Sequence, residues 1–274
     1  MASVEKEYVL GTHDAEVERL GIQHRAWRPR ALAAWASAGI GPGHTVLDVG
    51  CGPGYAALDL AELVGIRGRV LAIDKSQRFL SALETMSSER GLNNIETFKA
   101  DFDAADFPRV TADRAWCRWV LCFMQKPRDL LARLATALEP QGVLVLHEYF
   151  NYSTWQTAPP CPELEEFVAA VMASWRDTGG EPNVALTLPS WLEAAGFELR
   201  SLRPIVNIVQ KDDMLWSWLR AFIDVGRRRL IDLGYLSESR SEAIWQAFTD
   251  LEARDRTWMI TPGVLEIIAT RGNP

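Results

Sequence analysis

A short stretch near residue 50 limits what this chain can fold into more than any other. Residues 45–49, Thr-Val-Leu-Asp-Val, are typical of a buried strand, and residues 55–64 have the apolar pattern of a helix. Between them lies Gly-Cys-Gly-Pro-Gly, in which Gly50 and Gly52 carry no Cβ and let the backbone approach a ligand closely. The helix that begins at Tyr55 supplies unpaired N–H groups and a partial positive charge. This unit predicts a ligand site at one end of a sheet.

The alternation of strand and helix continues to about residue 150. Further buried strands are predicted at 69–73, 95–99, 115–121 and 143–146. Ser76 is a good N-cap for a helix that Gly91 ends, and Pro127 opens another helix. Two later strands are predicted at 197–209 and 264–269. The sequence therefore predicts an α/β fold, a mostly parallel sheet with helices on both faces.

Helical segments frame this region. Residues 14–27 have helical spacing, and Pro29 is expected to end that helix and to open a second one, to about Ala38. Proline-rich residues 150–188 interrupt the alternation and contain an expected helix near 163–175. Further helices are expected near 190–196, 213–233 and 238–254. We interpret 1–40 as an N-terminal helical lid and 41–274 as the main domain, with insertions at about 150–188 and 212–256. The first insertion is either a lid or a decorative loop, and its position after the fifth strand favours a lid.

Several ligands fit a glycine-rich turn. The Walker A pattern is absent, which argues against a P-loop kinase or ATPase. The dinucleotide pattern fits imperfectly, because counting from Gly52 places Gly54 second and Ala57 last. A nicotinamide cofactor therefore stays open at this point.

Acidic residues follow the first three predicted strands. Asp74 ends the second strand, 20 residues after Gly54, where a carboxylate accepts the ribose hydroxyls of an adenosine cofactor. Asp101 follows the third strand and can accept from an adenine amino group, while Phe102 can pack near the ring. Acids after strands one, two and three are what an adenosine with a charged amino-acid tail needs.

At these residues the chain resembles the class I S-adenosylmethionine-dependent methyltransferases. The resemblance covers roughly residues 40–150 and rests on a set of segments: VLDVGCGPG at 46–54, AIDKS at 72–76, KADFDAADFP at 99–108, DRAWCRWVLCFM at 113–124 and LEPQGVLVLHEY at 138–149. It implies a Rossmann-like seven-stranded sheet, mostly parallel, whose last strand near 264–269 is antiparallel. It also implies S-adenosyl-L-methionine as cofactor and S-adenosyl-L-homocysteine as its product.

The resemblance also implies roles for single residues. Gly50 and Gly52 approach the methionine part, Asp74 holds the ribose and Asp101 meets the adenine. The other cofactor-binding residues implied by the matched segments are Asp48, Cys51, Lys75 and Phe102.

The N-terminal run and the end of the fourth strand add further candidates. YVLG at 8–11 and RLGIQHRAW at 19–27 look like the lid helices of a small-molecule subgroup, the thiol, natural-product and UbiE-like methyltransferases. This match suggests that Tyr8 and Gln23 close over the cofactor. Arg118 is a candidate contact for the cofactor carboxylate or the acceptor, with a surface ion pair as the alternative.

Residues after the fifth strand are candidates for the acceptor site. His147 ends that strand, where open α/β sheets place their sites, and its unperturbed pKa of ~6.5 suits a general base. The alternative is a packed, hydrogen-bonded histidine. Glu148 is expected on the opposite face, and Trp119 in the core. The predicted pocket residues are Tyr149, Asn151, Tyr152 and Trp155.

Composition excludes several other classes. Lys and Arg number 29 against 36 Asp and Glu, and this net charge of −7 argues against a nucleic-acid partner. The arginines at 220 and 227–229 are read as a solvated helix face rather than an RNA patch. Four cysteines without a CxxC pair and only four histidines predict no metal site. No apolar run approaches the ~18 residues of a membrane-spanning helix, and the first residues lack the apolar core of a signal peptide, so a cytoplasmic protein without a membrane partner is expected.

The function predicted from these features is methyl transfer from S-adenosylmethionine to a small-molecule acceptor by in-line displacement. Two alternatives stay open, a methyltransferase for protein or RNA and a non-catalytic module that binds an adenosine cofactor. The acceptor atom and the oligomeric state are not predicted.

Overall fold

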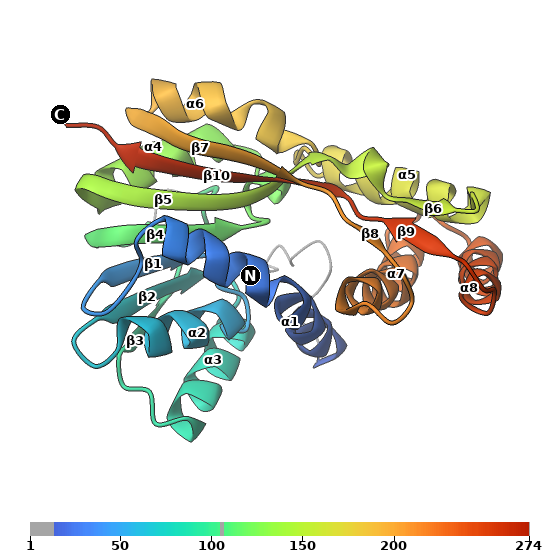
Figure 1. Ribbon diagram of the computed structural model, residues 1–274, viewed down its shortest axis with the longest axis horizontal. Helices are drawn as coiled ribbons and strands as arrows, with labels where there is room; N and C mark the ends of the chain where they lie inside the picture. The colour runs from blue at the N-terminus through green and yellow to red at the C-terminus, as the bar shows by residue number, and fades with distance from the viewer. Residues whose placement is uncertain (1–13, 105–106, 274) are drawn as a thin grey trace, which may run out of the picture.

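The computed structural model describes residues 14–104 and 107–273 (Figure 1). Within these ranges seven strands form one sheet in the order β3–β2–β1–β4–β5–β10–β7. Every neighbouring pair is parallel except the two that β10 makes, with β5 and with β7. The predicted seven-stranded, mostly parallel sheet with an antiparallel last strand is therefore confirmed. The strands are β1 (Thr45–Val49), β2 (Arg69–Asp74), β3 (Ile95–Lys99), β4 (Ala112–Arg118), β5 (Leu138–Asn151), β7 (Phe197–Ile205) and β10 (Gly263–Arg271).

Helices cover both faces of this sheet. On one face lie α1 (Asp14–Ser37), α2 (Tyr55–Val64) and α3 (Gln77–Glu89), and on the other lie α4 (Pro127–Ala137) and α6 (Leu188–Ala194) (Figure 1). Side chains alternate along each strand, so Val46 packs in the cluster that holds Trp35 of α1, whereas Leu47 packs in the cluster that holds Leu131 of α4. The result is a three-layer sandwich with a buried central sheet.

Local signals set the helix ends beside the carboxyl edge. Ser76 caps α3 because its Oγ accepts a hydrogen bond from Phe79 N at 3.3 Å. Gly91 follows that helix with a φ of 67°, and Pro127 is the first residue of α4, both as predicted. Gly54, with a φ of 90°, precedes α2.

A second layer of structure lies beyond the carboxyl ends of the parallel strands (Figure 1). It contains α5 (Pro162–Asp177), α7 (Met214–Asp232), α8 (Glu238–Glu252) and three 3₁₀ turns, η1 (Leu121–Phe123), η2 (Tyr152–Thr154) and η3 (Val184–Leu186). A small antiparallel sheet, β6 (Gln156–Ala158), β9 (Trp258–Ile260) and β8 (Ile208–Val209), joins it. This sheet was not predicted, because strands of two or three residues leave no periodic pattern. α1 packs against α7, so the N-terminal helix contacts this layer.

The predicted break at Pro29 is wrong. α1 runs through Pro29 to Ser37 without interruption. A proline inside a helix costs about 3 kcal/mol, because it removes one hydrogen bond and crowds the preceding turn. Trp27, Ala31 and Trp35 on either side are fully buried, and each large side chain contributes roughly 1.5–3 kcal/mol on burial, which offsets that cost.

The predicted bounds of three strands also need correction. β4 begins at Ala112 and ends at Arg118, not at residue 121, because Trp119 has a φ of 54° and the left-handed residue turns the chain out of the sheet. β5 extends well beyond 143–146 on both sides. The strand predicted at 197–209 is two strands, β7 and β8, which belong to different sheets.

Of the helices in the described ranges, none is long and apolar enough to cross a membrane.

Candidate functional site

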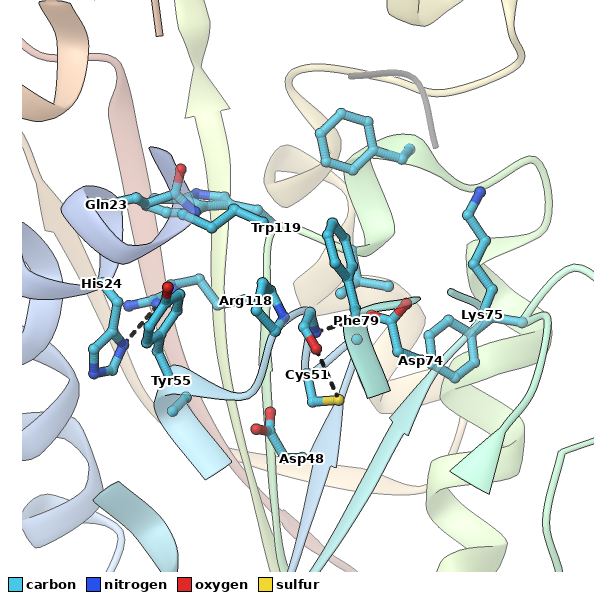
Figure 2. A pocket seen from close by; sticks show the side chains of 18 of the residues that line it. Gln23, His24, Asp48, Cys51, Tyr55, Asp74, Lys75, Phe79, Arg118 and Trp119 are labelled. Atoms are coloured by element: carbon cyan, nitrogen blue, oxygen red, sulfur yellow. Dashed lines mark hydrogen bonds between the residues drawn. The ribbon is translucent and has the colours of Figure 1, made fainter. Parts of the chain in front are cut away.

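A cavity of about 160 Å³ opens at the carboxyl edge of β1, β2 and β4. The structure brings almost all of the predicted cofactor-binding residues to its wall (Figure 2). These are Gln23, Asp48, Gly50, Cys51, Gly52, Asp74, Lys75, Asp101, Phe102 and Arg118. Tyr8 lies outside the described residues.

The glycine-rich turn forms one side of the cavity. Gly50 N and Cys51 N both donate to Ile73 O, at 2.8 and 3.0 Å, which ties the turn to the end of β2. Gly50 and Gly52 have φ angles of 68° and 55°, in the left-handed region that favours glycine. A Cβ at Gly52 would have only Leu20 Cδ1 nearby, at 3.9 Å. The missing side chain at this position therefore leaves open space in the wall of the cavity.

Asp74 holds the turn from the next strand. Its Oδ2 accepts from Gly52 N at 2.9 Å, and its Oδ1 accepts from Ser76 N at 2.8 Å. Burial raises the pKa of Asp74, and these backbone donors oppose the rise. Each carboxylate oxygen can accept a second hydrogen bond, so Asp74 can still receive two hydroxyl groups.

A second group of residues lies at the side of the cavity next to β3. Asp101 is exposed, and its Oδ1 accepts from Asp103 N at 3.0 Å. Phe102 and Phe79 are buried at 8% and 3% exposure and line the same wall. An acid beside two apolar rings can accept from the amino group of a flat heterocycle that packs against them.

Two charged groups meet at the floor of the cavity. Asp48 is 2% exposed, and no hydrogen-bond partner for its Oδ2 exists among the described residues. Burial raises the pKa of Asp48 to about 7, against the opposing effect of Arg118. Burial also lowers the pKa of Arg118 to about 10, so this side chain remains a cation at neutral pH.

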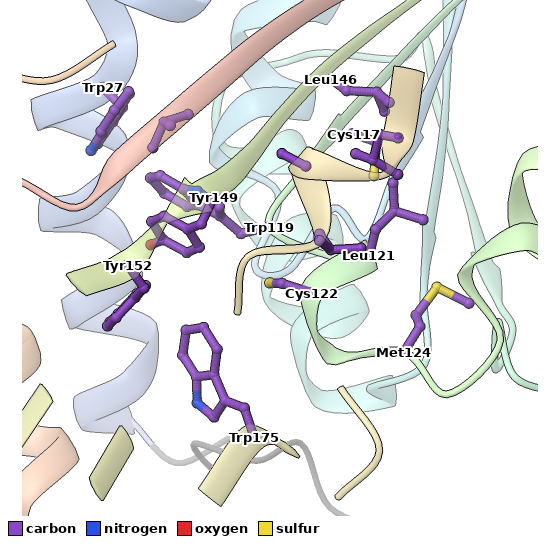
Figure 3. Close-up of a cluster of buried hydrophobic side chains, with 14 of the residues drawn as sticks. Trp27, Cys117, Trp119, Leu121, Cys122, Met124, Leu146, Tyr149, Tyr152 and Trp175 are labelled. Atoms are coloured by element: carbon purple, nitrogen blue, oxygen red, sulfur yellow. The ribbon is translucent and has the colours of Figure 1, made fainter. Parts of the chain in front are cut away.

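An aromatic wall closes the opposite part of the cavity. Trp119 stacks on Tyr149 with ring centroids 5.2 Å apart, Tyr149 lies 6.1 Å from Trp175, and Trp175 contacts Phe123 at 4.5 Å. All four rings line the cavity (Figure 3 labels three of them). We call these four residues the aromatic wall. Its rings come from the ends of β4 and β5, from η1 and from α5, which places a large apolar surface beside the charged floor.

Helix α1 covers the cavity from the N-terminal side. Arg19, Gln23 and His24 on this helix line the cavity. Gln23 Oε1 accepts from Trp218 Nε1 of α7 at 3.1 Å and from Arg19 Nη1 at 2.9 Å. Phe222 of α7 lies 5.4 Å from the Arg19 guanidinium and also lines the cavity. These contacts fix the cover to α7.

His147 stands apart from the cavity. Its side chain is fully buried, and its Nε2 lies 3.1 Å from Glu266 Oε2 of β10. Trp116 and Trp27 pack on the ring at 4.9 and 6.1 Å. The face of the sheet that carries His147 is covered by α1, so this geometry matches the packed histidine that was the alternative in the sequence. As expected, Glu148 lies on the other face, where its Oε1 accepts from Val120 N and Leu121 N, both at 2.8 Å.

Of the predicted acceptor residues, the structure brings only Tyr149 to the cavity wall. Asn151 is outside it, and Tyr152 and Trp155 are buried behind it, where Tyr152 packs on Tyr149 and Trp175 at 4.8 and 5.1 Å. Trp119 is largely buried as expected, but it also lines the cavity.

Sequence reasoning missed other residues at this wall. His24, Tyr55, Trp175 and Phe222 line the cavity and were not singled out. His24 and Trp175 lie on apolar helix faces, and such a pattern predicts core packing as well as it predicts a place at the cavity wall. Only the position of Tyr55, directly after the glycine-rich turn, could have indicated it.

Comparisons with known proteins relate part of this chain to methyltransferases. Residues 46–142 match a family model described as a methyltransferase domain. The sterol 24-C-methyltransferase of Eremothecium gossypii is 28% identical over 124 residues, which cover 45% of this chain and 33% of that protein. The nocamycin O-methyltransferase of Saccharothrix syringae is 35% identical over 106 residues, 37% of this chain and 36% of that protein. The chain thus spans about a third of the length of these relatives.

One solved structure extends the likeness to most of the chain. Coclaurine N-methyltransferase, bound to N-methylheliamine and SAH, superposes with a TM-score of 0.58 over 89% of this chain and 70% of its own, at 19% identity. At this identity the likeness shows a shared fold.

Proposed function

Because residues 46–142 match a methyltransferase domain, we propose that the chain is a class I enzyme that transfers a methyl group from S-adenosylmethionine to a small-molecule acceptor. The observation that carries this proposal is the meeting of the glycine-rich turn, Asp74 and Asp101 at one cavity. A nicotinamide enzyme is disfavoured, because the dinucleotide pattern was imperfect and the family match is to a methyltransferase domain.

The residues of the cavity fit this cofactor. Asp74 would accept the ribose hydroxyls, and Asp101 would accept the adenine amino group between Phe79 and Phe102. The open space at Gly52 leaves room for the amino-acid end beside Cys51, and Lys75 stands next to Asp74. We assign the carboxylate of that end to Arg118, whose Nη1 has no hydrogen-bond partner among the described residues.

When bound, the sulfonium supplies a methyl group that is already activated for displacement. The protein therefore needs mainly to align the acceptor and to exclude water, and alignment alone can contribute about 7–11 kcal/mol. We assign the exclusion of water to α1, the described part of the lid that the sequence predicts over residues 1–40. The segments at about 150–188 and 212–256 supply α5 and α7. Trp175 of α5 and Phe222 of α7 line the cavity.

We place the acceptor against the aromatic wall. Trp119, Tyr149, Trp175 and Phe123 offer apolar ring surface and little charge, which suits a flat, apolar molecule. Two of the relatives are named for a sterol and for nocamycin, which supports a small-molecule acceptor. A cavity covered by α1 and α7 disfavours a folded protein or an RNA as acceptor. Tyr152 then supports the wall from behind, and Trp155 packs on Tyr152 at 6.0 Å.

A labelling experiment tests the proposal. The full chain is incubated with methyl-labelled S-adenosylmethionine and a small-molecule extract, and the labelled products are identified by mass spectrometry. We expect label in a low-mass apolar product, and none with Asp74→Asn at the same cofactor concentration. Label only in protein or RNA would overturn the small-molecule acceptor. Bound cofactor with no label in any fraction would leave a binding module.

A further inference from the structure

His24 of α1 connects the cover of the cavity to its floor. Its ring is 6% exposed, and its two nitrogens contact different elements. Nε2 lies 2.9 Å from Asp59 Oδ2 of α2. Nδ1 lies 3.4 Å from Arg118 Nη2 at the end of β4 (Figure 2). His24 is thus the point at which α1, α2 and β4 meet beside the cavity.

These two contacts determine where the proton of His24 lies. A guanidinium has donors only, so Arg118 must donate and Nδ1 must accept, which requires Nδ1 without a proton. The proton then lies on Nε2 and is donated to Asp59. Asp59 also accepts from Arg28 Nε at 2.7 Å. Although burial alone would raise it, the hydrogen bonds from His24 and Arg28 hold the pKa of Asp59 below its usual range, so its carboxylate stays ionised.

Arg118 is held only in part by the protein. Its guanidinium lies over the rings of Trp119 and Trp116, at 5.2 and 5.6 Å from their centroids. In the described part of the chain nothing accepts a hydrogen bond from its Nη1, although that atom is buried. A buried donor without an acceptor is costly, and Arg118, which lines the cavity, can bind an anionic group of a ligand there.

We infer that His24 is a positioning residue, which holds Arg118 in the orientation that binds the carboxylate at the amino-acid end of the cofactor. This inference rests on the proposed function and deepens it. The neutral imidazole fixes Nη2 and, with it, the orientation of the planar guanidinium of Arg118, which lines the cavity. Because His24 belongs to α1, the covering helix itself completes the carboxylate site.

The same geometry makes the site sensitive to pH. The groups that face His24 are Asp59 and the Tyr55 ring of α2, Arg28 on its own helix and Arg118 of β4. Burial lowers the pKa of His24, the Asp59 hydrogen bond opposes this, and Arg118 adds to the lowering. In acid, Nδ1 gains a proton that faces the guanidinium, and the contact is lost. Asp48 also titrates near Arg118, so a pH profile alone does not distinguish an effect of His24 from an effect of Asp48. Variants of His24 are therefore needed.

Two ligands and two variants test the inference. S-adenosylhomocysteine carries the amino-acid end, whereas 5′-methylthioadenosine lacks it and serves as the matched control ligand. Asn at position 24 places an amide oxygen where Nδ1 accepts from Arg118, but loses the donor to Asp59. Gln places an amide N–H near Nε2, keeps the donor to Asp59, and loses the acceptor for Arg118. The two variants thus separate the two contacts of His24.

Calorimetric affinities of both ligands are measured for the wild type and the two variants at pH 8. We expect His24→Gln to weaken S-adenosylhomocysteine about tenfold and methylthioadenosine less than twofold, and His24→Asn to retain the wild-type ratio.

Equal losses for both ligands in His24→Gln, or equal ratios in the two variants, would overturn the inference. If one variant fails to fold, the other decides, since a fall of the ratio by about tenfold in His24→Asn, or equal losses for both ligands in His24→Gln, overturns the inference as well. Failure of the wild type to bind either ligand would instead refute the proposed function.

Discussion

A Cβ built on Gly50 would lie 2.2 Å from Cγ2 of Val120, so the turn after β1 and the loop after β4 fit together only with glycine at this position. The nearest protein atom to a Cβ on Gly52 is 3.9 Å away. Both residues have positive φ, but only Gly50 is also needed for packing between two protein segments.

Gly50→Ala and Gly52→Ala therefore form a matched pair. We expect Gly50→Ala to lose at least ~2 kcal/mol of unfolding free energy, from backbone strain and the clash with Val120. Gly52→Ala should lose about 1 kcal/mol from strain alone, yet its added methyl should weaken S-adenosylhomocysteine at least tenfold. Urea denaturation and calorimetric titration give the two quantities. Equal stability losses, or normal binding by Gly52→Ala, would contradict this distinction.

Asp74→Asn tests the ribose contact. The amide retains one oxygen but replaces the other with a donor, which then faces Gly52 N or Ser76 N and no longer accepts from a ribose hydroxyl. We expect the affinity for S-adenosylhomocysteine to fall by about 1.5–3 kcal/mol, the range for a hydrogen bond to a charged group. Asp129→Asn, an exposed change in the first turn of α4, serves as the surface control. The same affinity in both variants would remove Asp74 from the site.

Trp175→Leu tests the aromatic wall. We expect the wild type to bind 2-naphthol about tenfold more tightly than 1-decanol, because a flat ring system packs on fixed rings without losing chain entropy. In Trp175→Leu this preference should fall below about threefold. Trp191→Leu is the control, since Trp191 of α6 packs under Arg128 of α4 and does not line the cavity. A preference that survives Trp175→Leu would place the acceptor elsewhere.

Glu148 makes stability depend on pH in a defined direction. Burial raises its pKa to about 7, against the backbone donors of Leu121 and Val120. The folded state then holds this proton at pH values where the unfolded chain has released it, so stability falls as pH rises from about 4.5 to about 7. Glu148→Gln has no proton to release, and its oxygen can still accept from both donors.

We expect Glu148→Gln to gain on the wild type by up to ~3 kcal/mol between pH 5 and pH 8. The measurement is urea denaturation of both proteins at the two pH values. A difference between them that stays constant with pH would show that Glu148 is ionised in the folded protein at both.

The residues that the sequence placed correctly are those with a local signal. The strand, turn and helix at 45–64 and the cap at Ser76 depend on neighbours along the chain, and the structure confirms them. Pro29 was misjudged, because burial of Trp27 and Trp35 against distant strands outweighs a local preference. For His147, the alternation of side chains along the strand predicts that His147 and Glu148 lie on opposite faces of the sheet. It does not indicate which of the two faces α1 covers.

For the same reason, only some of the residues that line the cavity could be predicted from the sequence. Asp74 and Asp101 follow strands whose ends must meet at one edge of a parallel sheet, so their placement follows from topology. Trp175 and His24 reach the cavity only through the packing of α5 and α1, which no spacing in the chain indicates. Trp119 reaches it because of a left-handed backbone turn, which is unusual for a large residue.

The most direct test of the central claim is calorimetric titration of the full chain with S-adenosylhomocysteine, with NAD as the comparison ligand. The account predicts saturable binding of one S-adenosylhomocysteine per chain, lost or much weakened in Asp74→Asn, and no saturable heat with NAD. Tight binding of NAD with no heat from S-adenosylhomocysteine would contradict it.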